Sequence, residues 1–200
     1  MSLKKISKAK LDKILKSEFE YLKDAILNGK NPYHLFCLGT SVAVNSEIRM
    51  VVLRNVINNY SIFFNADWRS PKVDQLKKNN NAMALFYDSV RRVQLRLNCS
   101  AVINYNNKIS KSIWNKTPLQ SRKCYMGPFS PSDKLDNYHP NIPLNYLKQD
   151  PDKDISQNGY KNFCSIELKI NKIDILQLHH DGHIRFEFDL KNNQILYVAP

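Results

Sequence analysis

The sequence predicts a mainly β domain flanked by helices, and three observations lead to this prediction. One helical pattern opens the chain, and from residue 34 onward apolar residues follow a period of two or form short apolar runs. Dipeptides that favour turns separate these runs at Asn45-Ser46, Asn58-Asn59 and Asp88-Ser89. This spacing suits an antiparallel meander or a Greek-key barrel.

The opening segment is typical of an amphipathic helix. Apolar residues recur at three- and four-residue intervals from Leu11 to Ile26, lysines occupy the opposite face, and the pattern ends near Asn28-Gly29. The lysine-rich start is not followed by the apolar core of about 7–15 residues that a secretory signal contains. Every apolar stretch is far shorter than the roughly 20 residues that a membrane-spanning helix needs. We therefore expect no membrane segment and a cytoplasmic location.

The remaining periodic segments predict strands. They cover residues 35–44, 49–56, 61–64, 83–87, 91–103, 164–170, 173–178, 184–188 and 195–198. Within the fifth strand, Leu95 and Leu97 alternate with Gln94 and Arg96, so one face belongs to the core and the other carries polar groups. We interpret the polar face as a candidate wall for a ligand.

One helix is predicted to interrupt the strands over residues 70–78. Ser70 is suited to the N-cap, Pro71 to the first helical position and Asp74 to the first turn. The start of a helix carries unpaired backbone N–H groups and the positive end of the helix dipole, which favour an anion. With Ser70 and Lys72 beside it, this helix start is a candidate anion site.

The 200 residues are expected to form one domain, residues 1–200, because 42% hydrophobic and 24% charged residues are ordinary for a globular chain of this length. Residues 1–30 contain the opening helix. After a short helix around residues 109–114, residues 115–160 hold six of the nine prolines and little periodicity. We expect a long surface excursion there, and such loops often cover sites.

The charge balance indicates an anionic partner. The formal net charge is +12, and six of the eight arginines fall between positions 49 and 96, although lysine is abundant throughout. Arginine presents a planar fork suited to phosphate or carbonyl groups, so the anion is expected in this middle third. Neither the N-terminal lysines nor Arg91-Arg92 accompany a nucleic-acid recognition motif, and we expect no nucleic-acid partner.

Metal and glycine-rich phosphate motifs are not predicted. The four cysteines are scattered singly, and His179, His180 and His183 fall in a strand-and-turn pattern without a cysteine or carboxylate cluster. The five glycines form no nucleotide-binding fingerprint. Any phosphate must therefore be held by side chains or by a helix start.

Three segments rich in arginine follow one another along the middle of the chain. They read R-M-V-V-L-R at 49–54, F-F-N-A-D-W-R-S-P-K at 63–72 and R-R-V-Q-L-R at 91–96. This order resembles the FMN-binding split barrel of the pyridoxamine 5'-phosphate oxidase family, in particular its D-x-R-S-x-K branch. On a flat strand Arg49 and Arg54 would point to opposite faces, so a bulge or a strong twist would be needed to bring both to one ligand.

The resemblance implies a six-stranded antiparallel split barrel of Greek-key type that binds FMN at the interface of a homodimer. In the family, the first segment contacts the FMN, the serine and lysine of the second hold its phosphate, and the strand glutamine contacts the flavin ring. The cofactor-binding residues implied here are Arg49, Val51, Leu53, Arg54, Asn65, Arg69, Ser70, Lys72, Gln94 and Arg185. Asn65 stands in the place of a threonine that reaches the phosphate.

Two departures from the family pattern bear on activity. Pro71 replaces an arginine of the oxidases, a loss for which Arg69 is expected to compensate. Near the C-terminus, His183 and Arg185 match the motif that binds the substrate phosphate and the flavin, but Asp181 replaces its first arginine and the upstream tryptophan is missing. Because an aspartate repels a phosphate, efficient oxidation of pyridoxamine phosphate is not expected.

The sequence thus predicts an FMN-dependent oxidoreductase that acts on an unknown small molecule, with His183 and Arg185 as candidates for substrate contact. One alternative is a genuine pyridoxamine or pyridoxine 5'-phosphate oxidase, which would form hydrogen peroxide and pyridoxal phosphate. Another is a split-barrel protein that holds FMN or haem without turnover.

Overall fold

One antiparallel sheet organises the computed structural model, which describes residues 6–58 and 60–200. Its strands are β1 Leu35–Val42, β2 Asn45–Val52, β3 Asn55–Ile57, β4 Ser61–Asp67, β5 Asn81–Asp88, β6 Val93–Tyr105, β7 Phe163–Gln177, β8 Ile184–Asp189 and β9 Gln194–Tyr197. The order across the sheet is β2-β1-β5-β6-β7-β4-β3, and β8 and β9 continue from the second half of β7. The predicted mainly β antiparallel architecture is confirmed.

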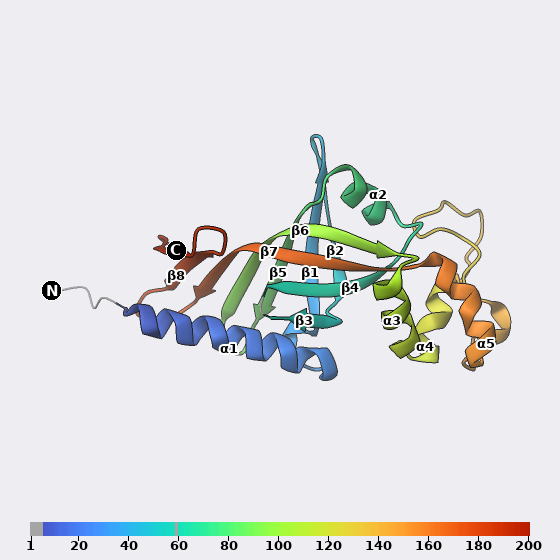
Figure 1. Ribbon diagram of the computed structural model, residues 1–200, viewed down its shortest axis with the longest axis horizontal. Coiled ribbons are helices and arrows are strands. Elements are labelled where there is room, and N and C mark those ends of the chain that lie inside the picture. The colour runs from blue at the N-terminus through green and yellow to red at the C-terminus, as the bar shows by residue number, and fades with distance from the viewer. Residues whose placement is uncertain (1–5, 59) are drawn as a thin grey trace.

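The helices flank this sheet. They are α1 Lys8–Leu27, α2 Pro71–Lys78, α3 Lys108–Lys116, α4 Leu119–Arg122 and α5 Lys153–Ser156, with short 3-10 turns η1 Pro32–His34, η2 Lys123–Tyr125, η3 Leu144–Tyr146 and η4 Gln157–Asn162. Figure 1 shows α1 lying along one side of the sheet, while α3, α4 and α5 gather at one end and β8 lies at the other. None of the helices in the described ranges has the length and apolar character needed to cross a membrane.

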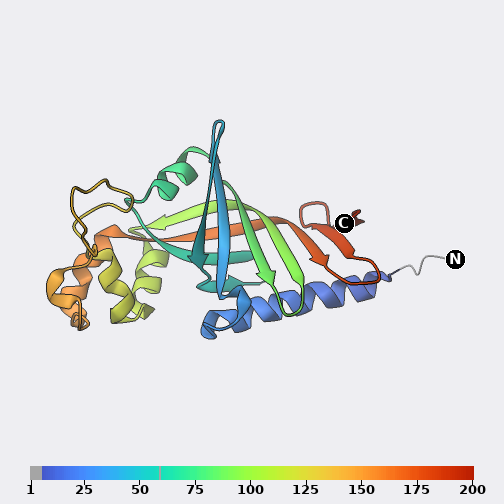
Figure 2. The ribbon, with the colours of Figure 1, turned by 180° about the vertical axis from the view of Figure 1, so that it is seen from behind.

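The sheet is open along one seam, as in a split barrel. Strands β2 and β4 approach each other there, but within the described chain they share no strand pairing. The chain crosses this seam at residues 53–54: Leu53 N donates to His34 O at 2.9 Å, and Arg54 N donates to Phe63 O on β4 at 2.8 Å. Seen from behind, the tip of the β1–β2 hairpin projects beyond the sheet beside α2 (Figure 2).

The core lies between the curled sheet and α1. Phe36, Phe64 and Phe86 are fully or almost fully buried on the inner face, and Phe19 and Leu22 pack against that core from α1. Burial of each such side chain stabilises the fold by about 1.5–3 kcal/mol. The predicted opening helix is therefore confirmed, and its apolar face completes the core.

A buried ion pair fixes α1 to the turn between β5 and β6. Glu18 is 2% exposed; its carboxylate accepts from Arg91 Nη1 and from the Tyr33 hydroxyl, each at 2.8 Å. The Arg91 guanidinium also contacts Asp88 and lies 3.6 Å above the centre of the Tyr21 ring. Burial, followed by the charge of Glu18, raises the pKa of Tyr33, so its hydroxyl stays a donor.

Several boundaries differ from the sequence prediction. The first turn falls at residues 43–44, where Ala43 has a φ of 52°, rather than at Asn45-Ser46. The segment 49–56 divides into the end of β2 and β3, because the chain crosses the seam between them, and the two strands expected over 164–170 and 173–178 form one continuous β7. One division and one merger leave nine strands in the described residues, the same number as the strand segments that the periodic pattern predicts. Asn58 has a φ of 48° in its predicted turn, and Asn59 lies outside the described residues.

The excursion after residue 115 folds back over the outer face of β4 and β7. It contains short helical turns, which are too brief to produce a periodic pattern in the sequence. Trp114, which is fully buried, anchors it by packing against the rings of Tyr125, Tyr160 and Phe163. The excursion thereby becomes part of the surroundings of the open seam.

Candidate functional site

A cavity of about 380 Å³ lies at the open seam. Strands β2 and β4, the start of α2 and the segment that begins at η2 supply its walls. The lining residues are Arg49, Met50, Val51, Val52, Arg54, Asn65, Ala66, Asp67, Lys72, Cys124, Tyr125 and Pro131. Five of the predicted cofactor-binding residues, Arg49, Val51, Arg54, Asn65 and Lys72, therefore meet in one place, which we call the seam cavity.

Arg49 reaches the seam cavity from β2 and is held by neutral and acidic partners. Its Nη2 lies 3.0 Å from Gln75 Oε1 on α2 and 2.8 Å from Glu47 Oε2, and its Nη1 donates to Thr40 Oγ1. These contacts orient the guanidinium before any ligand arrives. Because Glu47 is largely exposed, it screens the charge of Arg49 only in part.

Lys72 carries a partly buried side chain into the same cavity from the first turn of α2. In the described part of the chain, its side chain has no hydrogen-bond or ion-pair partner. Burial, and after it the positive charge of Arg49, lowers the pKa of Lys72 below its ordinary value. A cation in this situation gains free energy when an anion enters beside it.

Arg54 lies where the chain crosses the seam, between β2 and β3. Its backbone is tied to β4 through Phe63, while its exposed side chain has no polar partner within residues 6–58 and 60–200. The break in the strand after Val52 explains how Arg49 and Arg54 come to line one cavity. From the sequence alone, a bulge or a strong twist is predicted to bring the two arginines together, and the structure shows a break between two strands instead.

A second cavity of about 350 Å³ adjoins the first beneath α3 and shares Arg54 and Asn65 with it. Asn65 on β4 pairs directly with Ser165 on β7, and both side chains line this second cavity. Asn65 Oδ1 and Ser165 Oγ are buried and have no hydrogen-bond partner among the described residues. Because buried polar atoms are nearly always paired, these two atoms indicate a place for a polar ligand group or ordered water.

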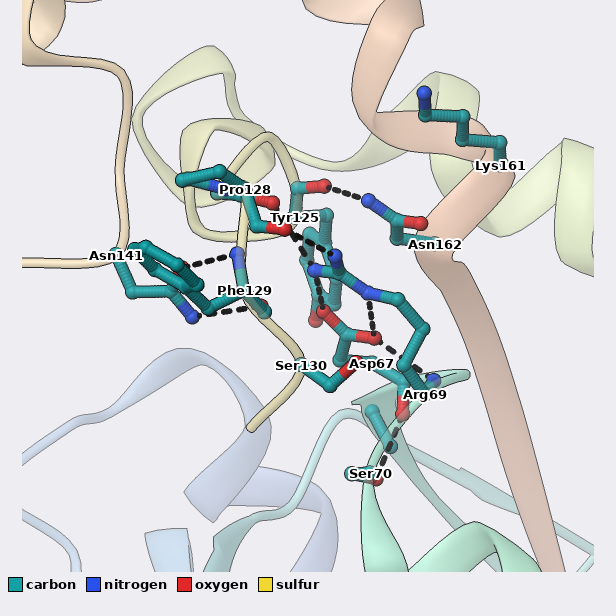
Figure 3. A network of polar contacts seen from close by, with 12 residues as sticks. Asp67, Arg69, Ser70, Tyr125, Pro128, Phe129, Ser130, Asn141, Lys161 and Asn162 are labelled. Atoms are coloured by element: carbon teal, nitrogen blue, oxygen red, sulfur yellow. Dashed lines mark hydrogen bonds and ion pairs between the residues drawn. The ribbon is translucent and has the colours of Figure 1, made fainter. Parts of the chain in front are cut away.

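Arg69 and Ser70 lie next to the seam cavity but face away from it. Arg69 makes a two-pronged ion pair with Asp67, with Nε 3.0 Å from Oδ1 and Nη2 2.8 Å from Oδ2 (Figure 3). This contact raises the pKa of the guanidinium. Ser70 is fully buried at the N-cap of α2, yet its hydroxyl donates to Asp67 O at 2.6 Å and does not cap the helix.

The remaining predicted residues lie elsewhere. Leu53 is fully buried in the core. Gln94 and Arg185 share one row across the outer face of the sheet, with Leu176 between them. Gln94 does not line the seam cavity, and along β6 it lies ten residues, roughly 30 Å of strand, from Asn104, which pairs with Ser165 beside the second cavity.

Arg185 and His183 are the two residues predicted to contact a substrate. Arg185 forms an ion pair with Asp174 at 2.8 Å, which raises the pKa of its guanidinium. His183 lies exposed in the turn before β8, where its ring accepts from His179 N at 3.2 Å. Within the described residues, no cluster of His, Cys, Asp and Glu side chains has the arrangement of a metal site.

Sequence reasoning missed several residues of the site. Thr40 and Gln75 orient Arg49, and Cys124, Tyr125 and Pro131 close the seam cavity from the excursion. The three residues of the excursion carry no motif or periodic signal, since their positions depend on how the excursion folds back. Thr40 and Gln75 fall in predicted elements, but no local pattern indicates their contact with Arg49. Ser165 could have been noticed, because it is a polar residue at an otherwise buried position of β7.

Comparison with protein families supports the predicted resemblance. Residues 15–104 match the family described as "Pyridoxamine 5'-phosphate oxidase, FMN-binding domain". The matched segment covers 90 of the 200 residues, and its similarity is to that FMN-binding domain. It includes all five predicted residues that line the seam cavity, which lie on β2, β4 and α2 and at the crossing between β2 and β3. Comparison with curated proteins finds no match.

Solved structures with similar folds cover almost the whole chain. A pyridoxamine 5'-phosphate oxidase-related, FMN-binding protein from Nostoc punctiforme has a TM-score of 0.73 at 16% identity, over 100% of both chains. PhzG from Burkholderia lata, solved with tetrahydrophenazine-1-carboxylic acid, has a TM-score of 0.65 at 14% identity, over 95% of this chain and 90% of PhzG.

A Clostridium acetobutylicum protein related to general stress protein 26, of the pyridoxinephosphate oxidase family, is also similar. Its TM-score is 0.56 at 12% identity, over 91% of this chain and 98% of the other. At these low identities, the likeness to the three structures concerns the fold. It confirms the split-barrel class predicted for the FMN-binding domain.

Proposed function

We propose that this chain binds FMN and uses it in an oxidoreductase reaction of the pyridoxamine 5'-phosphate oxidase-like type on a small molecule. The observation that carries the proposal is the convergence of Arg49, Arg54 and Lys72 on the seam cavity. Among the lining residues only Asp67 is acidic, and Arg69 neutralises it. The cavity therefore favours a strongly anionic group such as a phosphate.

The residues present fit the parts of FMN. Lys72 and Arg49 suit its phosphate, since both are cations close to the start of α2. Asn65 presents an unpaired buried oxygen between the two cavities, where a hydroxyl or N–H donor of the ligand would satisfy it. Val51 adds an apolar surface, and Arg54 a further donor for the ligand.

When bound, FMN would supply the redox chemistry by accepting and passing on electrons. The side chains of this protein would bind and orient the cofactor and restrict the access of water. Gln94, Arg185, Leu53, Arg69 and Ser70 also belong to the predicted cofactor site, and for them this role stays a prediction. His183 and Arg185 stay the candidates for substrate contact.

We further propose a homodimer, supported by the outer face of the sheet. Met50, Cys37 and Leu85 form one row on this face, and Met50 and the neighbouring Ile48 are 59% and 76% exposed. An apolar sheet face of this kind favours a protein partner. Gln94 and Arg185 lie on the same face, so a second copy would approach them as it covers the apolar row.

The visible absorption spectrum of the purified protein tests cofactor binding. We expect a flavin spectrum, and heat treatment should release a chromophore that is identified as FMN. A colourless protein that also fails to bind added FMN would overturn the proposal. Sedimentation equilibrium tests the dimer separately, and replacing Met50 and Ile48 with lysine should shift the protein toward a monomer.

A second candidate function is cofactor binding without turnover. The distance between the seam cavity and the His183–Arg185 cluster favours it, because in one chain no candidate for substrate contact lies near the proposed phosphate site. Reduction of bound FMN by NADH or NADPH, or formation of hydrogen peroxide with pyridoxamine phosphate, would exclude it. A haem absorption band in place of a flavin spectrum would favour a binding role for a different cofactor.

A further inference from the structure

One wall of the seam cavity is a segment with almost no regular structure. Residues 124–131, which we call the strap, place Cys124, Tyr125 and Pro131 against the cavity. Between η2 and residue 131 the strap has no helix or strand. Its position must therefore be fixed by contacts with other parts of the chain.

Three side chains hold the backbone of the strap (Figure 3). Asn162 Nδ2 donates to Tyr125 O at 2.8 Å, and Asn141 contacts both Phe129 N and Phe129 O through its amide group, at 3.1 and 3.0 Å. Arg69 contributes the middle contacts: its Nη2 donates to Gly127 O at 3.2 Å and its Nη1 to Pro128 O at 3.4 Å.

The strap also follows a path that leaves little space at its centre. A Cβ atom on Gly127 would lie 2.1 Å from the backbone oxygen of Asn141, which is far inside van der Waals contact. The two Arg69 contacts fall at this residue and the next. Arg69 thus joins the crowded centre of the strap to the end of β4.

Asp67 connects this arrangement to the ligand side. It is 8% exposed and lines the seam cavity, and its two carboxylate oxygens are both occupied by Arg69. Without Arg69, an unpaired carboxylate would face an anionic ligand, and the strap would lose its central contacts. Electrostatic and mechanical effects therefore depend on the same guanidinium.

We propose that Arg69 is a positioning residue that fixes the strap as the wall of the seam cavity and neutralises Asp67, so that an anionic cofactor is retained. Its effect on the cofactor rests on the proposed FMN binding, whereas its effect on the strap does not. The role differs from that of a phosphate ligand, because the guanidinium acts on the wall of the cavity.

Hydrogen exchange of the ligand-free protein tests the mechanical part. In Arg69→Met we expect amides of the strap to exchange about tenfold or more faster, because charge-assisted hydrogen bonds are lost. Exchange in α1 should stay unchanged, which shows that the fold is intact. Lys134→Met, which removes an exposed lysine, controls for net charge. Unchanged exchange in the strap of Arg69→Met would overturn the proposal.

Release of FMN, followed by its fluorescence after dilution, tests the retention part. We expect about tenfold or faster release from Arg69→Met and no change in Lys134→Met. Arg69→Lys keeps a positive charge for Asp67 but cannot span Asp67 and both carbonyls. It should recover part of the affinity for FMN while its strap still exchanges rapidly.

The two measurements separate the proposals. If the wild-type protein binds no FMN, the proposed function fails, and strap exchange alone decides the role of Arg69. If FMN binds and Arg69→Met releases it at the wild-type rate, retention by Arg69 is refuted. If Arg69→Lys restores both slow exchange and slow release, charge alone accounts for the effect and the positioning role is refuted.

Discussion

Lys72 and Arg49 line the same cavity, and within residues 6–58 and 60–200 the side chain of Lys72 has no polar partner. The two side chains repel each other in the ligand-free protein, because both are cationic and the only carboxylate that lines the cavity among the described residues, that of Asp67, is already paired with Arg69. A bound anion offsets that repulsion. Removal of one of these cations should therefore weaken the binding of an anion, while the ligand-free protein stays as stable or becomes more stable.

Affinity for FMN should fall as the pH rises toward 10.5, starting below the pH at which an ordinary lysine loses its proton. Burial and Arg49 lower the pKa of Lys72 in the ligand-free protein, and a bound phosphate favours the protonated form. Titration of FMN at several pH values measures this dependence. Lys72→Arg should flatten it, because arginine keeps its charge. An equal slope in both proteins would rule out Lys72 as the titrating group.

Replacing Lys72 and Arg54 together with alanine should weaken FMN binding by several kcal/mol, since each charge-assisted hydrogen bond contributes about 1.5–3 kcal/mol. The stability of the ligand-free protein should hold or rise, because Lys72 is partly buried beside Arg49 and, among the described residues, its side chain has no polar partner. Fluorescence titration and urea unfolding measure the two effects. Lys78→Ala, an exposed change at the far end of α2, is the control. Wild-type affinity in the double variant would place the phosphate elsewhere.

Glu18→Ala should destabilise the fold by about 1–3 kcal/mol, because it removes one of the two carboxylates that hold Arg91 and deprives the buried Tyr33 hydroxyl of its acceptor. Urea unfolding followed by circular dichroism measures the loss. Glu20→Ala removes an exposed carboxylate from the same helix and should cost less than about 1 kcal/mol. Equal effects of the two changes would contradict a central role for the Glu18–Arg91 pair.

Ser165→Ala should leave the stability of the ligand-free protein unchanged or raise it slightly, because the hydroxyl is buried and has no partner in the part of the chain that the structure describes. Ser156→Ala is the matched control: its hydroxyl is also buried, but it accepts from Arg122 Nη1 at 3.0 Å, so its loss should cost about 1–3 kcal/mol. Thermal unfolding compares the two. A marked loss in Ser165→Ala would show that the hydroxyl already has a partner and is not free for a ligand.

The sequence predicts best where local pattern and packing agree. The spacing of Leu11 and Leu22 identifies α1, and Ser70 with Pro71 marks the start of α2, because each signal arises within one turn or face of the element. The motif from Arg49 to Lys72 also identifies residues that meet at the seam cavity. Its elements lie on both sides of that seam.

Other features depend on contacts that no local pattern records. Arg69 was expected to face a phosphate, but its direction is decided by Asp67 and by the strap, whose carbonyls are distant in sequence. Gln94 belongs to the same motif order as Lys72, yet it lies on the outer face of β6 and does not line the seam cavity. The division of the segment 49–56 likewise follows from the opening of the sheet, which is a property of the whole fold.

Strand β7 spans the molecule without interruption, from Ser165 beside the cavities to Leu176 between Gln94 and Arg185. It pairs with β4 over residues 163–169, with β8 over residues 172–177, and with β6 along its length apart from a bulge at Asn171. The spacing between its two polar ends is set by a count of residues, at about 3.3 Å for each. A second protomer that contacts both ends of β7 must therefore match the distance between them. Inserting two residues into β7 should therefore put the halves of a shared site out of register even where every side chain is retained.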